Sequence, residues 1–242
     1  MRQWTYVWYE ILRTIRNRRF LIFSLIFPLV LFFSIAGEHR HVLLEGIPFP
    51  LYFMTGMMAF GSMTAITASG ARIAAERQAG WTRQIRITPL KTSTYFVAKV
   101  VTGYLMALFS ILILALAGTS LGVRLEATQW LIMVGLILVG LMPIAVIGIL
   151  LGHLVTVDSL GPALGGVTSL LALLGGAFGP LATSGTLLSV AKCLPSYWIV
   201  QAGKTALGGT GWPAEGWIVI AVWTVILVRL TALAYRRVTA RV

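Results

Sequence analysis

The sequence has little charge and almost no cysteine. Of its 242 residues only 11% are charged, seven residues are acidic, and Cys193 is the one cysteine. A single cysteine excludes an intrachain disulfide and the paired cysteines of common metal and redox motifs. Soluble domains average about a quarter charged residues. Together with a hydrophobic content of 58% and a mean hydropathy of +0.89, the scarcity of charge excludes a soluble domain.

The apolar residues form long runs, such as residues 105–116, rather than the alternation expected of a membrane β-barrel. A bilayer core of ~30 Å requires roughly 20 apolar residues per helix. The sequence therefore predicts one all-α membrane domain covering residues 1–242, with no room for a separate catalytic domain. The six predicted transmembrane helices span residues 20–37, 49–71, 95–118, 130–152, 162–182 and 217–235.

Residues 1–19 predict an amphipathic helix that lies in the membrane interface. Arginines make this segment costly to insert, at about 2.5 to 3.5 kcal/mol for each one near the bilayer centre. Its apolar residues nevertheless form one helical stripe: Trp4, Val7, Trp8, Ile11, Leu12 and Ile15. That pattern is typical of a helix in the interface plane. A signal peptide is the alternative, which the length of the following apolar segment disfavours.

The basic residues predict the orientation. Fourteen Lys and Arg fall on the side of both termini and of the segment 72–99, and four fall on the other side. By the positive-inside rule, both termini of this multi-pass protein are expected in the cytoplasm at the cell membrane. The basic residues that give the net charge of +12 are then explained by membrane orientation, and no nucleic-acid partner is predicted. Residues 183–215 are expected outside, where the apolar piece 194–207 is too short to span and predicts an interfacial or re-entrant helix.

Short motifs that could indicate enzymatic chemistry lack the required context. Gly203-Lys204-Thr205 has Trp198 where a phosphate-binding loop needs a glycine. The nucleophile-like spelling around Ser120 follows a membrane helix rather than a strand. No acidic residue falls in the middle of a predicted span, which disfavours an ion-coupled carrier.

Two groups of residues indicate how the helices pack and what they enclose. Three glycine pairs have the spacing that permits close helix approach: Gly148/Gly152, Gly161/Gly165 and Gly175/Gly179. A set of methionines and phenylalanines suits an adaptable apolar substrate pathway, and equally contact with lipid: Phe27, Met54, Met57, Met58, Phe60 and Met63. The sequence alone leaves these two interpretations open.

The segment 75–90, Ala-Glu-Arg-Gln-Ala-Gly-Trp-Thr-Arg-Gln-Ile-Arg-Ile-Thr-Pro-Leu, is followed by Tyr95 and Lys99 at the start of a span. It resembles the segment after the second span in permeases of the type-2 family of ATP-binding-cassette exporters. Residues 194–198 and the amino-terminal interfacial helix are also similar to that family, so the resemblance covers essentially the whole chain. One departure is Trp81, where many members carry a smaller threonine.

The resemblance implies a permease subunit that moves a hydrophobic or amphipathic substrate (drug, lipid or glycoconjugate) outward and does not itself hydrolyse ATP. It implies a second permease copy or paralogue and two separate ATP-binding subunits that hold ATP and magnesium, with no cofactor on this chain. It assigns a cytoplasmic coupling helix within 76–94 that docks on the ATPase through these residues: Glu76, Arg77, Gly80, Trp81, Arg83, Ile85, Arg86, Thr88, Pro89 and Leu90. An ion-coupled carrier or channel acting without an ATPase, or a hydrolase using Ser120, are the alternatives.

Overall fold

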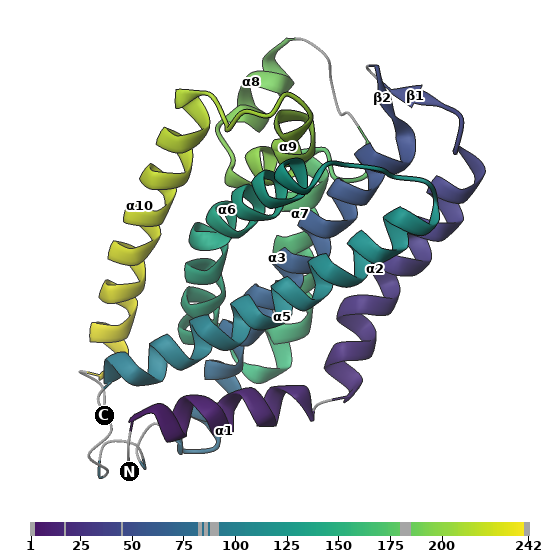
Figure 1. Cartoon of the computed structure of the whole chain (residues 1–242). Helices are drawn as coiled ribbons and strands as arrows, with labels where there is room; N and C mark the ends of the chain where they lie inside the picture. Colours follow the sequence, from purple (N-terminus) through teal and green to yellow (C-terminus); the bar gives the residue numbers. More distant parts are fainter. Residues whose placement is uncertain are drawn as a thin grey trace.

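The protein is a bundle of long helices, shown as a computed structural model in Figure 1. The structure describes residues 3–16, 18–44, 46–81, 84, 87, 92–179 and 185–239, without the side chains of residues 3, 18–24, 92 and 236–239. Helix α1 (Gln3–Ile15) lies at one end of the bundle, which we call the α1 end, together with the last turns of α10 (Ala214–Thr239) (Figure 1). A β-hairpin (residues 43–48), α8 (Thr186–Lys192) and α9 (Pro195–Leu207) lie at the opposite end, the hairpin end. The all-helical prediction is confirmed.

The described helices are α1 (Gln3–Ile15), α2 (Arg18–Glu38), α3 (Phe49–Gln78), α5 (Thr92–Ser120), α6 (Ala127–Leu154), α7 (Val157–Gly175), α8 (Thr186–Lys192), α9 (Pro195–Leu207) and α10 (Ala214–Thr239). An antiparallel hairpin of β1 (Leu43–Leu44) and β2 (Ile47–Pro48) joins α2 to α3. It turns at Gly46, whose φ of 78° is readily adopted only by glycine. The sequence patterns did not predict this hairpin.

Five helices of the described chain are long and apolar enough to cross a bilayer: Phe49–Gln78, Ser93–Ser120, Ala127–Leu154, Val157–Gly175 and Ala214–Tyr235. The first predicted span, 20–37, is helical as part of α2. α2 has 21 residues, but side chains are described only for its part Leu25–Glu38, so its crossing of the membrane stays a prediction. The described residues therefore support a multi-pass membrane protein with five candidate crossings, where the sequence predicted six.

Two helix boundaries differ from the predicted ones. α3 continues to Gln78 rather than ending at residue 71, because the charged residues of its last turns bind side chains and carbonyl groups of neighbouring helices. α7 covers Val157–Gly175 rather than 162–182. It ends early because Gly176 adopts a φ of 81° and donates its N–H to the carbonyl group of Leu173.

α3 is the central helix, although it is the least apolar of the five candidate spans. Its most apolar stretch has a mean hydropathy of only 1.2 and is 89% buried, whereas those of α7 and α10 are 11% and 17% buried. Helices α2, α5, α6, α7 and α9 all pack against α3. Because α3 is surrounded by protein rather than lipid, it tolerates Gly, Ser and Thr, which allow close helix packing.

Close contact between α3 and α6 depends on glycine. A Cβ added at Gly148 would lie 2.5 Å from a backbone oxygen of α3, and one at Gly70 would lie 2.5 Å from a backbone nitrogen of α6. A Cβ at Gly152 would lie 2.8 Å from the carbonyl oxygen of Gly70. The predicted packing role of Gly148 and Gly152 is confirmed. Nothing in the described part of the chain lies within 4 Å of a Cβ added at Gly161 or Gly165, so a packing role for this pair stays a prediction.

α1 presents a buried face and two exposed ones. The buried face carries Val7, Glu10 and Thr14. One exposed face is apolar and includes Trp4, Trp8 and Ile15. The other exposed face is basic and carries Arg13 and Arg16. The predicted apolar stripe is therefore divided, because Val7 belongs to the buried face. The exposed Trp face still suits a membrane interface, and that position stays a prediction.

The predicted apolar piece at residues 194–207 forms α9, which packs against α3, α6 and α7. Its side chains Trp198, Ile199 and Val200 are buried in the main core. α9 is thus part of the helical bundle at the hairpin end (Figure 1). Its depth in the membrane stays a prediction.

Candidate functional site

A cluster of buried charges joins α1, α3 and α5 at the α1 end. The Nζ atom of Lys99 on α5 lies 2.5 Å from Oε1 of Glu10 on α1 and 2.6 Å from Oε1 of Glu76 on α3. The exposed fractions of Lys99, Glu10 and Glu76 are 1%, 5% and 3%. We call these three residues the ionic junction.

Further donors complete the charge balance of the ionic junction. Arg13 donates from Nη1 to Oε1 of Glu76 at 2.9 Å, and the hydroxyl of Tyr95 donates to Oε2 of Glu76 at 2.6 Å. Removing a charge from water costs several kcal/mol, which is offset only where the charge gains an opposite partner and well-formed hydrogen bonds. Two carboxylates facing two cations meet this requirement, so the ionic junction is stable in a mostly apolar bundle.

Polar contacts extend from the ionic junction along α1. Arg72 of α3 donates to Oγ1 of Thr14 at 2.6 Å, and Thr14 donates to the carbonyl oxygen of Glu10 at 3.0 Å. Burial, followed by the negative charge of Glu10, raises the pKa of the Tyr6 hydroxyl well above its ordinary value, so Tyr6 stays neutral. α1 packs against α5, and these side chains attach it to α3.

The residue after Glu76 binds a different helix. The guanidinium group of Arg77 donates to the carbonyl oxygen of His153 and, at 3.2 Å, to that of Val155. These carbonyl groups lie at the C-terminal end of α6, where a cation is favourable. Two consecutive residues at the end of α3 therefore bind α1, α5 and α6.

The predicted coupling residues fall into three groups. Glu76 and Arg77 lie within α3 and have partners inside the chain, and Glu76 is too buried to contact another subunit directly. Gly80, with a φ of 71°, turns the chain after α3, and Trp81 is 38% exposed. The remaining predicted residues lie outside the described residues, and their role stays a prediction: Arg83, Ile85, Arg86, Thr88, Pro89 and Leu90.

The predicted pathway residues lie mostly inside the core. The side chains of Met54, Met57, Met58 and Met63 have no exposed surface, and Phe60 is 8% exposed. They pack between α3 and its neighbours in the main hydrophobic core. Phe27 of α2 is 52% exposed, and its ring lies 5.9 Å from that of Phe60. In this chain the methionines fill the core, and their predicted role in a pathway stays a prediction.

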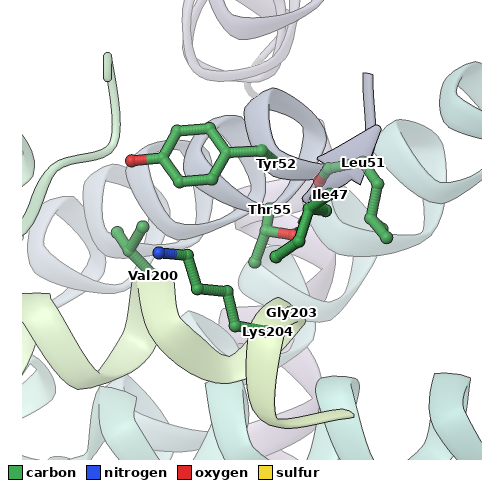
Figure 2. Close-up of a pocket in the computed structure, with 7 residues that line it drawn as sticks. All are labelled: Ile47, Leu51, Tyr52, Thr55, Val200, Gly203 and Lys204. Atoms are coloured by element: carbon green, nitrogen blue, oxygen red, sulfur yellow. Dashed lines mark hydrogen bonds between the residues drawn. The ribbon is translucent and has the colours of Figure 1, made fainter. Parts of the chain in front are cut away.

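A small pocket lies at the hairpin end, between β2, α3 and α9 (Figure 2). It is lined by Ile47, Leu51, Tyr52, Thr55, Val200, Gly203 and Lys204, and its volume is about 10 Å³. A space of that size holds about one water molecule. The pocket is therefore too small to bind a drug or a lipid.

Comparison with known proteins identifies the family. Residues 48–235 match the family model described as "ABC-2 family transporter protein". The chain belongs to this family. It is 27% identical over 191 residues to a Bacillus subtilis (strain 168) protein named "Putative transport permease YvfS", which covers 78% of each chain. No solved structure matches the chain.

Membership of the ABC-2 family confirms the resemblance found in the sequence. The protein is a membrane subunit of an ABC transporter, a transport subunit rather than the ATPase itself. The family also implies an ATP-binding partner.

Ser120 of this ABC-2 permease lies in the last turn of α5, where its hydroxyl donates to the carbonyl oxygen of Ala117.

Sequence reasoning missed the ionic junction. Glu76 and Lys99 were named only through the family resemblance, and Glu10 was not named, although it lies within the predicted amino-terminal helix of residues 1–19. One signal was available, since Glu10 falls between Val7 and Thr14 on a single helical face, which the structure shows to be buried. A lone acid on such a face requires a cation from another helix, but the sequence does not say which one.

Proposed function

We propose that this ABC-2 permease belongs to an exporter in which a separate subunit hydrolyses ATP and the permease moves a hydrophobic or amphipathic molecule outward. The observation that carries the proposal is the segment that follows α3. Trp81 and Ile87 are 38% and 87% exposed, while Glu76 and Arg77, just before them, are bound to three helices. Apolar side chains displayed beside a firmly held helix end suit docking of a partner protein. We assign that docking to the ATP-binding subunit.

The proposed complete transporter contains two ATP-binding subunits, which hold ATP and magnesium, and a second copy or paralogue of this permease. Its substrate is a drug, a lipid or a glycoconjugate. Support comes from family membership and from the apolar core, where the middle of α3 carries buried methionines and no charged residue. Chain termini and the segment 76–94 face the cytoplasm in this arrangement, in agreement with the distribution of basic residues.

Capture of the partner tests the proposal. The tagged chain, purified from its native membrane, is expected to bring down an ATP-binding subunit, and the chain alone is expected not to hydrolyse ATP. Replacing Trp81 and Ile87 together with alanine should weaken the affinity for the ATPase by about thirtyfold or more, since truncating one buried aromatic anchor typically costs about 2 kcal/mol of binding free energy. The amount of ATPase recovered with the chain should fall accordingly. Quantitative mass spectrometry of the purified complex measures this change.

Trp217→Ala is the matched control, because Trp217 is an exposed tryptophan at the opposite end of the bundle, near the start of α10. It should leave ATPase recovery unchanged. Equal recovery from the Trp81/Ile87 variant and the wild type would show that this segment is not the docking site. ATP hydrolysis by the isolated chain, or transport without any ATPase, would support the carrier alternative instead.

Cys193 allows the orientation to be measured. It is an exposed, free cysteine that follows α8 at the hairpin end. We expect it to react with a membrane-impermeant maleimide added to intact cells, because the hairpin end is proposed to face outward. A Gln84→Cys substitution in a Cys193→Ser background should react only after the membrane is opened. Labelling of residue 84 in intact cells would reverse the proposed orientation.

A further inference from the structure

The ionic junction is the one place in the described chain where three charged side chains of three different helices are buried together. Lys99 contacts Glu10 and Glu76, which lie 89 and 23 positions away from it in the sequence. Replacing buried ion pairs with apolar residues is often neutral or stabilising. Stability alone therefore gives little reason for such a group, and its position in the bundle suggests another role.

That position is the end of α3, at the start of the segment proposed to dock the ATPase. Glu76 and Lys99 join α3 to α5, and Glu10 and Arg13 of α1 bind the same two residues. Among the described residues, Arg72 of α3 also donates a hydrogen bond to Thr14 of α1. The ionic junction and Arg13 therefore connect the end of α3 directly to α1.

The geometry points to a positioning role: the ionic junction and Arg13 make α1 move together with the ends of α3 and α5 when the partner ATPase displaces the segment after α3. This inference rests on the proposed function. It assigns α1 a role beyond anchoring, because a displaced α1 carries its exposed Trp4 and Trp8 through the membrane interface. The residues involved are positioning residues, since they act by holding α1 against α3 and α5.

Two double variants test the connection. Each removes one positive and one negative charge, so the net charge is unchanged. Glu10→Gln with Arg13→Gln removes both charges of α1 and leaves Glu76 paired with Lys99. Glu76→Gln with Lys99→Met removes the other half and leaves Glu10 near Arg13, whose atoms lie 3.8 Å apart. Lys192→Met with Glu215→Gln is the matched control, because it neutralises one cation and one anion that are exposed elsewhere.

Hydrogen exchange detected by mass spectrometry provides the readout on the complex with its copurified ATPase, with and without ATP and vanadate. In the wild type and the control, trapping should change exchange both in residues 3–15 and in residues 79–91. In each junction variant, the change in residues 79–91 should persist and the change in residues 3–15 should be lost. A purely structural role would raise exchange in α1 without removing its response to trapping.

A trapping response of α1 in both variants equal to that of the wild type would overturn the inference. So would a wild-type complex in which residues 79–91 respond and α1 does not. If neither region of the wild type responds, or if no ATPase copurifies, the proposed function itself fails and this inference fails with it. Thermal unfolding of each variant shows that it is folded, and the second variant serves if the first does not accumulate.

Discussion

Replacing Lys99 with methionine alone should lower the free energy of unfolding by about 3–5 kcal/mol, the usual cost of removing one partner from a buried ion pair. The change leaves the carboxylates of Glu10 and Glu76, 5% and 3% exposed, with Arg13 as their remaining cation. We expect a lower yield in membranes and a fall in Tm of roughly 2–4 °C for each kcal/mol. Thermal unfolding of the purified chain in detergent measures this effect.

A second substitution should restore most of the loss. Adding Glu10→Gln to Lys99→Met removes the carboxylate that has lost its 2.5 Å contact with Lys99, and it leaves Glu76 with Arg13 and the Tyr95 hydroxyl. The double variant is therefore expected to be more stable than Lys99→Met alone, a coupling that a double-mutant cycle quantifies. Lys192→Met, at an exposed position, should change little. An unchanged Tm for Lys99→Met would mean that the ionic junction contributes nothing to stability.

Alanine at Gly148 should destabilise the contact between α3 and α6 by about 1–3 kcal/mol, the usual cost of overpacking. Its added Cβ would lie 2.5 Å from the carbonyl oxygen of Thr67, and backbone atoms cannot rotate away as a side chain can. Gly70→Ala should act similarly, since its Cβ would lie 2.6 Å from the carbonyl carbon of Gly148. Thermal unfolding in detergent again provides the measurement.

Gly135 supplies the control within the same helix. It is exposed on α6, and nothing in the described chain lies within 4 Å of a Cβ added there. Gly135→Ala should therefore be neutral or slightly stabilising, because alanine favours a helix over glycine by about 1 kcal/mol. If Gly148→Ala and Gly135→Ala have the same Tm, the close approach of α3 and α6 is not a determinant of stability.

Much of the architecture follows from the apolar runs. The helices begin and end within a few residues of the predicted spans for α5 and α6, since long apolar sequences must satisfy their backbone groups within a helix. Agreement is poorer where tertiary contacts extend or end a helix. α3 is prolonged by the binding of its charged residues to other helices, and α7 ends at Gly176.

The candidate site was predicted less completely. The resemblance to ABC exporters drew attention to residues 76–90 and included Lys99, but it placed Glu76 at a surface between subunits. The structure instead buries its carboxylate against Lys99 and Arg13. Similarly, the methionines of α3 were compatible with a pathway or with lipid, whereas the structure packs them into the core.

The sequence by itself determined that this is a multi-pass helical membrane protein of the ABC-2 type, because apolar length, basic segments and motif order are all properties of the linear chain. Only the tertiary structure decided which helix is central and which charges meet. α3 is less apolar than its neighbours yet the most buried, because five helices surround it. Lys99 and Glu10 are 89 residues apart and pair because α1 and α5 pack together. Such a contact depends on how the helices are arranged in space, which no local pattern encodes.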